Sequence, residues 1–278
     1  MPPEISAKAH PFLFSEPTIV FAPMEGVTDA PMREWVGGIS SFNYGVTEFI
    51  RVTDSVLPKK IFLRDVPEVL KNSRTKSGLP IQVQLLGGNA ERLAESAETA
   101  IEVGACGIDL NFGCPAPTVN RHDGGATLLK YPERIEEIVS KVRARVPSHF
   151  PVSAKLRLGY DDPTMILENA LRAERGGASW ITVHARTKVN GYQPPAFWKM
   201  LAPVVSTLKI PVIANGELWN MEDLMQCQRD SGAKHFMLGR GALANPFLAK
   251  NIRGYLKGPD ANRTTDAVPT NSVPTKEE

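Results

Sequence analysis

The residue with the clearest chemical potential in this chain is a cysteine that follows a short apolar run. Cys114 lies in the stretch Asp109-Leu110-Asn111-Phe112-Gly113-Cys114-Pro115, and a glycine-rich segment, residues 123–126, lies downstream. The apolar run over residues 107–110 predicts a strand that ends at a polar Asn and a turn. A thiol on a tight turn at the end of a strand is well placed to touch a ligand, whereas a thiol inside a strand usually packs.

Polar residues follow the other apolar runs in the same way. Eight short runs, β-branched or bounded by Pro and Gly, have the character of buried parallel strands. They cover residues 18–22, 44–47, 81–85, 107–110, 152–156, 180–183, 212–214 and 235–238. The polar side chains within these runs or at their ends are Glu25, Glu48, Arg51, Gln84, Asn111, Lys155, Arg157, His184, Asn215, Glu217 and Arg240.

Helical patterns separate several of these runs and indicate how the polar residues are brought together. Apolar residues recur at helical spacing over 90–103, 132–146, 164–175 and 221–230. Eight strands that alternate with helices predict an α/β fold of the (β/α)8 TIM-barrel type, whose active site lies at the C-terminal ends of the strands. An open doubly wound sheet is the alternative, but no Gly-x-Gly-x-x-Gly follows the first run.

The last two strand ends indicate a phosphate-bearing cofactor. Asn215-Gly216 and Gly239-Arg240-Gly241 follow the seventh and eighth runs, where many such barrels bind phosphate with backbone N–H groups. Lys155 would then lie beside the ring system, where a cation stabilises the anionic form of a reduced flavin, and Gln84 could bond to the ring edge. No Cys/His cluster suggests a metal. Taken singly, a residue such as His184 is more often a structural histidine than a ligand, and one such as Cys114 is more often inert. Gln84 and Lys155 alternate with apolar residues, so either could face outward against a helix.

Composition limits the class of protein. Hydrophobic residues make up 42% and charged residues 22% of 278 residues, and the formal net charge is +2, so the overall charge does not identify a nucleic-acid binder. Three scattered cysteines exclude a disulfide framework. We expect a cytoplasmic protein without a secretory signal or membrane span. Residues 1–17 are expected to be irregular, residues 18–255 to form the barrel, and residues 256–278 to be a disordered polar tail.

Together these residues resemble the tRNA-dihydrouridine synthase family, and their finer pattern is similar to its dihydrouridine synthase C branch. The resemblance covers about residues 18–255 in the family's order. It rests on Ala22-Pro23-Met24-Glu25-Gly26, Gln82-Val83-Gln84-Leu85, the Asn111–Pro115 motif with its downstream glycines, Lys155-Leu156-Arg157, His184-Ala185-Arg186-Thr187, Asn215-Gly216-Glu217-Leu218-Trp219 and Gly239-Arg240-Gly241.

The resemblance implies an FMN-dependent barrel enzyme that reduces the C5–C6 bond of a uridine in the D-loop of tRNA, position 16 in that branch, with NADPH as the reductant. It implies that Cys114 donates the proton, since a thiol of ordinary pKa is protonated at neutral pH. It assigns Arg51, Asn111, Arg157 and Tyr192 to the uridine or nearby RNA. It assigns FMN to Pro23, Met24, Glu25, Gln84, Lys155, His184, Asn215, Gly216, Glu217, Gly239 and Arg240.

Two observations bear on the RNA partner. Residues 51–76 carry seven basic and three acidic side chains, a local net charge of +4, which suits either phosphate contacts or a solvated surface. The family normally adds a C-terminal helical domain that grips tRNA, and residues 257–278 are too few and too polar to form it. We expect a monomer that lacks this domain.

The alternatives to a tRNA-modifying enzyme are an FMN-dependent reductase of a free pyrimidine or other small molecule, a shortened form with weak or no tRNA activity, and a catalytically silent RNA-binding protein.

Overall fold

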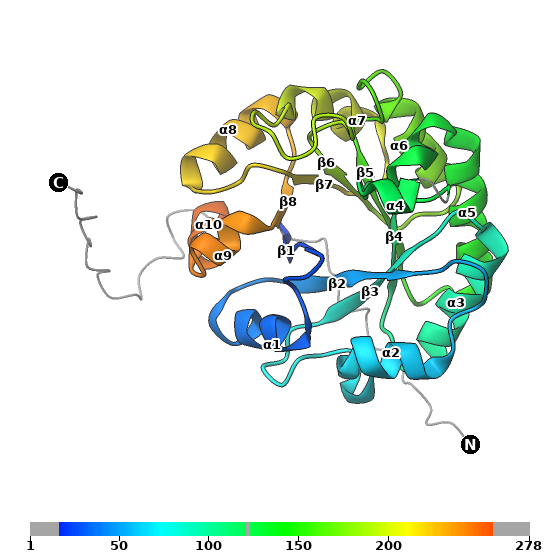
Figure 1. Ribbon diagram of the computed structural model, residues 1–278. Coiled ribbons are helices and arrows are strands. Elements are labelled where there is room, and N and C mark those ends of the chain that lie inside the picture. The colour runs from blue at the N-terminus through cyan, green and yellow to red at the C-terminus, as the bar shows by residue number, and fades with distance from the viewer. Residues whose placement is uncertain (1–16, 121–122, 258–278) are drawn as a thin grey trace, which may run out of the picture.

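A closed barrel of eight parallel strands forms the body of the protein (Figure 1). The computed structural model describes residues 17–120 and 123–257. The strands are β1 (Ile19–Phe21), β2 (Tyr44–Arg51), β3 (Ile81–Leu86), β4 (Ile108–Asn111), β5 (Val152–Arg157), β6 (Ile181–His184), β7 (Val212–Asn215) and β8 (His235–Leu238). Each strand pairs with the next, and β8 closes the ring on β1. The predicted TIM barrel is confirmed, and the open sheet is excluded.

Helices surround the barrel, and four of them match the predicted segments. α3 (Ala90–Glu102), α5 (Pro132–Arg145), α6 (Ile166–Arg175) and α8 (Met221–Ser231) each begin and end within two residues of the expected positions. The sequence patterns did not predict α1 (Ala30–Ile39), α2 (Lys59–Asp65), α4 (Pro117–Asn120), α7 (Ala202–Thr207), α9 (Arg240–Ala244), α10 (Leu248–Lys257), or the 3-10 helices η1 (Pro67–Lys71), η2 (Gly125–Lys130) and η3 (Trp198–Leu201).

The apolar core has two parts, one inside the barrel and one outside it. Inside, Tyr44 and Trp180 meet edge-to-face, with ring centroids 5.9 Å apart, and pack with Val20, Val46 and Met237. Outside, the opposite faces of the strands pack against the helices, as in Val83 and Leu110. Side chains alternate between the inside and the outside of the barrel along each strand. Polar residues occupy the inward positions nearer the C-terminal ends.

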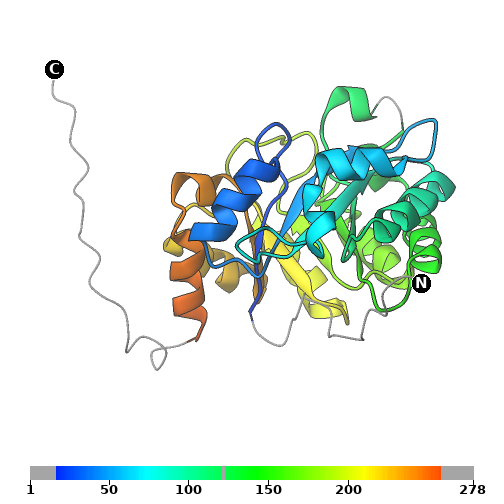
Figure 2. The same cartoon turned by 90° about the horizontal axis from the view of Figure 1, so that it is seen from below.

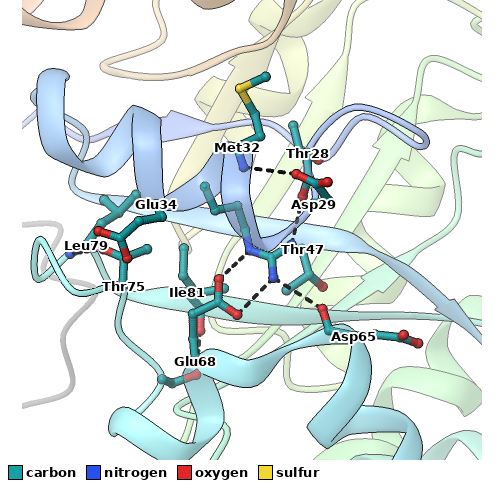
Figure 3. Close-up of polar contacts among 12 residues, drawn as sticks. Thr28, Asp29, Met32, Glu34, Thr47, Asp65, Glu68, Thr75, Leu79 and Ile81 are labelled. Carbon is teal, nitrogen blue, oxygen red and sulfur yellow. Dashed lines mark hydrogen bonds and ion pairs between the residues drawn. The ribbon is translucent and has the colours of Figure 1, made fainter.

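Loops that follow the strands gather at the C-terminal ends of the barrel, along the upper edge of Figure 2. A buried ion pair between α1 and η1, outside the barrel, fixes part of this rim. Arg33 on α1 donates to both carboxylate oxygens of Glu68 on η1, at 2.7 and 2.9 Å, and to the carbonyls of Thr28 and Asp65 (Figure 3). The Thr28 hydroxyl in turn accepts from the Met24 N–H at 2.9 Å. The pair therefore ties the loop after β1 to the segment that leads from β2.

The chain ends lie largely outside the described residues. The predicted irregular segment, residues 1–17, is described only at Pro17, and the predicted tail, residues 256–278, only at Leu256 and Lys257, which complete α10. Within residues 17–120 and 123–257, no helix has the length and apolar character needed to cross a bilayer.

Candidate active site

A cavity of about 670 Å³ opens at the C-terminal ends of the strands. Side chains or backbone from every strand end or the loop after it line this cavity. It contains all but one of the predicted site residues: Pro23, Met24, Glu25, Gln84, Asn111, Cys114, Lys155, Arg157, His184, Tyr192, Asn215, Gly216, Glu217, Gly239 and Arg240. The chain therefore brings together polar side chains as far apart in sequence as Glu25 and Arg240.

Arg51 is the predicted site residue that lies elsewhere. It lines a second cavity of about 460 Å³ together with Arg92 and Arg134, and its guanidinium donates to the Thr118 carbonyl at 3.1 Å. Thr118 belongs to α4, which follows the Cys114 turn. The second cavity thus adjoins the loop that carries Cys114 but is not part of the main cavity.

A chain of hydrogen bonds crosses the wall of the main cavity from β3 to β4. The Gln84 amide nitrogen donates to Asp109 at 2.7 Å, and the Asn111 amide nitrogen donates to the Gln84 oxygen at 2.8 Å. The Asn111 oxygen then accepts from the Gly113 N–H at 2.9 Å. Asp109 also accepts from the Ser153 hydroxyl at 2.5 Å. The strand register places these groups side by side, since Gln84 pairs with Asp109 and Asp109 with Ser153.

Cys114 is buried at the cavity wall on a turn that is held at its backbone. Its carbonyl accepts from the Ala126 N–H at 3.1 Å and from the Asn120 amide at 3.0 Å. Gly125 has φ +59°, and a Cβ there would lie 2.9 Å from the Cys114 carbonyl oxygen, so the downstream glycine permits a close approach. Burial raises the pKa of the Cys114 thiol, and Glu25 adds to this, against the lowering effects of the Ala116 backbone, Arg157 and Lys155. The thiol is therefore protonated at neutral pH.

Lys155 lies next to Asn111 across β4 and β5 and faces the cavity. Among the described residues it has no hydrogen-bond or ion-pair partner, which is unusual for an ammonium group in a largely buried position. The pKa of Lys155 is lowered to about 8, first by burial and then by the neighbouring Arg157, against the raising effects of Asp109 and Cys114. Such a cation favours an anionic ligand, which would restore its charge.

His184 and Gly216 form a tight corner of the same cavity. The His184 Nδ1 atom is buried without a hydrogen-bond partner among the described residues. Burial lowers the pKa of His184 well below its ordinary value, and the neighbouring Arg157 and Lys155 lower it further, so the ring is neutral at pH 7. Gly216 has φ +109°, and a Cβ there would lie 2.9 Å from His184 Cδ2. Only glycine fits this conformation and this space.

Arg157 joins the Cys114 turn to the loop after β6. Its Nε donates to the Gly113 carbonyl at 2.7 Å, and its Nη1 donates to the carbonyls of Thr187 and Gly191 at 3.0 and 2.8 Å. Its guanidinium also lies 5.1 Å from the centre of the Tyr192 ring, at the mouth of the cavity. Arg157 therefore holds two loops in place, in addition to facing the cavity.

The rim near β7 and β8 includes residues that sequence reasoning missed. Arg186 is fully buried, donates to the Gln193 carbonyl and forms an ion pair with Glu217. The Trp219 indole also donates to Glu217, at 2.8 Å, and the Arg240 guanidinium lies 5.1 Å from the Trp219 ring. Glu217 has φ +59°, and its carboxylate has three partners, since Arg240 also lies 3.8 Å from it. Alternation of inward and outward positions along β4 would have revealed Asp109, two residues before Asn111. Arg186 and Trp219 lie on loops, where no such alternation exists to reveal them.

No group of three or more His, Cys, Asp or Glu side chains that could hold a metal occurs in the described part of the chain. The donors at the cavity are instead amides, one imidazole and cations, which suit a polar organic or phosphate-bearing ligand.

Comparison with known proteins identifies the family. The sequence model of the family described as Dihydrouridine synthase (Dus) matches residues 20–271. The chain belongs to this family. It is 49% identical over 235 residues to the tRNA-dihydrouridine(16) synthase of Shewanella oneidensis, covering 84% of this chain and 75% of that protein. The enzymes of the same name from Neisseria meningitidis and Pseudomonas putida are 47% and 48% identical, with 86% and 87% of this chain covered and 72% and 75% of theirs.

Membership of the dihydrouridine synthase family makes this protein a flavin-dependent oxidoreductase that reduces uridine in tRNA to dihydrouridine.

Solved structures agree on the barrel alone. A variant of NCR from Zymomonas mobilis superposes with a TM-score of 0.56 at 18% identity, covering 87% of both chains. A 2-naphthoyl-CoA reductase in complex with 2-naphthoyl-CoA superposes with a TM-score of 0.64 at 11% identity, covering 85% of this chain and 50% of that one.

Proposed function

We propose that this dihydrouridine synthase reduces the uridine at position 16 of tRNA, with FMN held in the main cavity and Cys114 as the proton donor. The position follows the names of the enzymes from Shewanella oneidensis, Neisseria meningitidis and Pseudomonas putida. The observation that carries the placement of FMN and Cys114 is one cavity that combines an unpaired cation, an orphaned imidazole nitrogen, a glycine cradle and a protonated thiol.

The residues present fit FMN. Gly216 and Gly239 line the cavity at the C-terminal ends of β7 and β8, and Arg240 adds a cation, which together suit the phosphate. Lys155 supplies a cation for the ring system, and Gln84 supplies an amide that Asp109 already orients. The buried Nδ1 of His184 lacks a partner that a ligand would provide. Pro23, Met24, Glu25, Asn215 and Glu217 complete the proposed FMN wall.

The chemistry of the chain's own residues is acid catalysis in a closed pocket. When bound and reduced, FMN supplies a hydride for C6 of the uracil. Cys114 gives a proton to C5, and because its pKa is raised it holds that proton at neutral pH. The thiolate left behind is favoured by the nearby Lys155 and Arg157. The two transfers together add the two hydrogens of dihydrouridine.

Four residues are proposed to meet the RNA. Asn111 and Arg157 face the cavity, and Tyr192, 56% exposed, lies at its mouth. A uridine must leave its stack to reach such a cavity, and an aromatic ring at the entrance suits an unstacked base. Arg51, beside the second cavity, would meet the RNA backbone rather than the uracil.

The remaining assignments follow from the proposed activity. We assign NADPH as the reductant, the cytoplasm as the location and a monomer as the working form. Residues 18–255 form the FMN-binding domain in this proposal, and α10 extends beyond it to Lys257.

Mass spectrometry of tRNA tests the proposal. Unmodified tRNA incubated with the protein, FMN and NADPH is expected to gain two hydrogens at one D-loop uridine, which fragmentation assigns to position 16. Free uridine under the same conditions should stay unreduced. Reduction of free uridine without reduction of tRNA would instead identify a small-molecule reductase.

A further inference from the structure

The hydrogen-bond chain from Asp109 to Gly113 runs in one direction only. The Gly113 N–H donates to Asn111, Asn111 donates to Gln84, and Gln84 donates to Asp109, with donor–acceptor distances of 2.9, 2.8 and 2.7 Å. The two middle groups are amides, and each would fit its space equally well after a flip that exchanges its oxygen and nitrogen. Something at the ends must therefore select one orientation for both.

The Gly113 N–H at one end and the Asp109 carboxylate at the other select one orientation for both amides. The backbone N–H of Gly113 can only donate, so the Asn111 oxygen must face it. An ionised Asp109 can only accept, so the Gln84 nitrogen must face it. Burial raises the pKa of Asp109, but a proton on this carboxyl would lie toward the Ser153 oxygen, 2.5 Å from the other carboxyl oxygen, and the oxygen facing Gln84 would still accept.

Burial makes this selection costly to violate. Gln84 has no exposed surface and Asp109 is 2% exposed, so water cannot replace a lost partner at that end. Gln84 is also fixed at its backbone, where its N–H donates to the Thr47 hydroxyl at 2.9 Å. A reversal of the Gln84 amide would turn Asn111 as well and bring an amide nitrogen against the Gly113 N–H.

We propose that Asp109 is a positioning residue that orients Gln84 and Asn111 and thereby fixes the Gly113–Cys114 turn. Asp109 reaches the acid through this chain of amides and does not touch the thiol itself. The proposed function gives the turn its catalytic meaning, but the structural effect on Gly113 does not depend on that function.

Three variants of the full chain test the inference. Asp109→Leu removes the acceptor but keeps the branched shape of the side chain. Asp109→Asn keeps a side-chain oxygen that can accept from Gln84, and Ser153→Ala removes the other partner of the same carboxyl group. The first readout is hydrogen exchange at the Gly113 amide. The second is the single-turnover rate of uridine reduction by the flavin-loaded enzyme at saturating tRNA.

In Asp109→Leu, exchange at Gly113 should accelerate and the single-turnover rate should fall, each about tenfold, as expected for one lost buried hydrogen bond. Asp109→Asn should recover most of the protection at Gly113 and most of the rate. Ser153→Ala leaves the acceptor of Gln84 in place and should change both by clearly less than Asp109→Leu does. If Asp109→Leu does not fold, Asp109→Ser, whose side chain is too short to reach Gln84, carries the same expectation. Unchanged exchange at Gly113, or equal acceleration in Ser153→Ala, would overturn the inference. If the parent protein makes no dihydrouridine, the proposed function is refuted. Hydrogen exchange at Gly113 would still decide whether Asp109 positions the turn.

Discussion

At the scale of single residues, the surroundings of Cys114 favour an acid over a nucleophile. Its thiol pKa is raised by burial, whereas a nucleophilic cysteine needs a lowered one. We therefore expect Cys114→Ala to keep its flavin, because the substitution removes no group of the proposed FMN wall. Its single-turnover rate of uridine reduction should fall about 10²- to 10⁴-fold, the usual contribution of a general acid. Flavin absorbance and dihydrouridine yield measure the two effects. A variant that reduces uridine at the parent rate would rule out this role.

The sequence predicted single residues of the site where they stand at strand ends. Gln84, Lys155 and His184 lie at inward positions of β3, β5 and β6. Alternation in the sequence also allowed Gln84 and Lys155 to face outward against a helix, and the structure excludes that. Arg186 could not be found in this way, because its contact with Glu217 joins two loops. Arg51 was assigned with the site residues, but β2 carries it to a neighbouring cavity.

At the scale of elements, the buried pair between α1 and η1 offers a stability test. Arg33 is 1% and Glu68 is 6% exposed, and both carboxylate oxygens are bonded (Figure 3). Arg33→Met leaves a buried carboxylate without its partner, which should lower the free energy of unfolding by about 3–5 kcal/mol. Arg33→Met/Glu68→Leu should be clearly more stable than the single variant, because no charge is stranded. Urea unfolding at pH 7 measures both, and equal losses would show that the cost comes from packing.

Three of the four predicted helices, α3, α5 and α8, are longer than every helix that was missed. Length does not decide alone, because α6 was predicted while α1 and α10, also of ten residues, were not. α3, with thirteen residues and an Asn89 cap, shows a full amphipathic repeat, whereas α4 has four residues and shows none. β2 continues to Arg51, four residues past its predicted end, through a register shift between Val46 and Phe49. There the Thr47 hydroxyl accepts the Gln84 N–H, so a polar residue that ended the apolar run is part of the strand.

At the scale of the whole molecule, the basic segment 51–76 does not lie on the rim as a unit. Lys59 pairs with Glu102 at the end of α3, and residues 73–80 precede β3 at the N-terminal end of the barrel. Of the seven cations, Arg51 alone lines either of the two cavities described above. The count of charges in the sequence could not reveal this, because the segment runs from one end of the barrel to the other.

This arrangement predicts that the two ends of the segment differ in their effect on tRNA binding. Arg51→Gln should weaken binding and reduce the slope of log affinity against log salt by about one, as for one lost phosphate contact. Lys76→Gln is the matched control, since Lys76 is exposed, carries the same charge, and lies just before β3 at the opposite end. Fluorescence anisotropy of labelled tRNA over a range of KCl concentrations measures both slopes. Equal slopes in the two variants would mean that the segment acts as a diffuse charge, and that the rim beside the second cavity does not contact the RNA backbone.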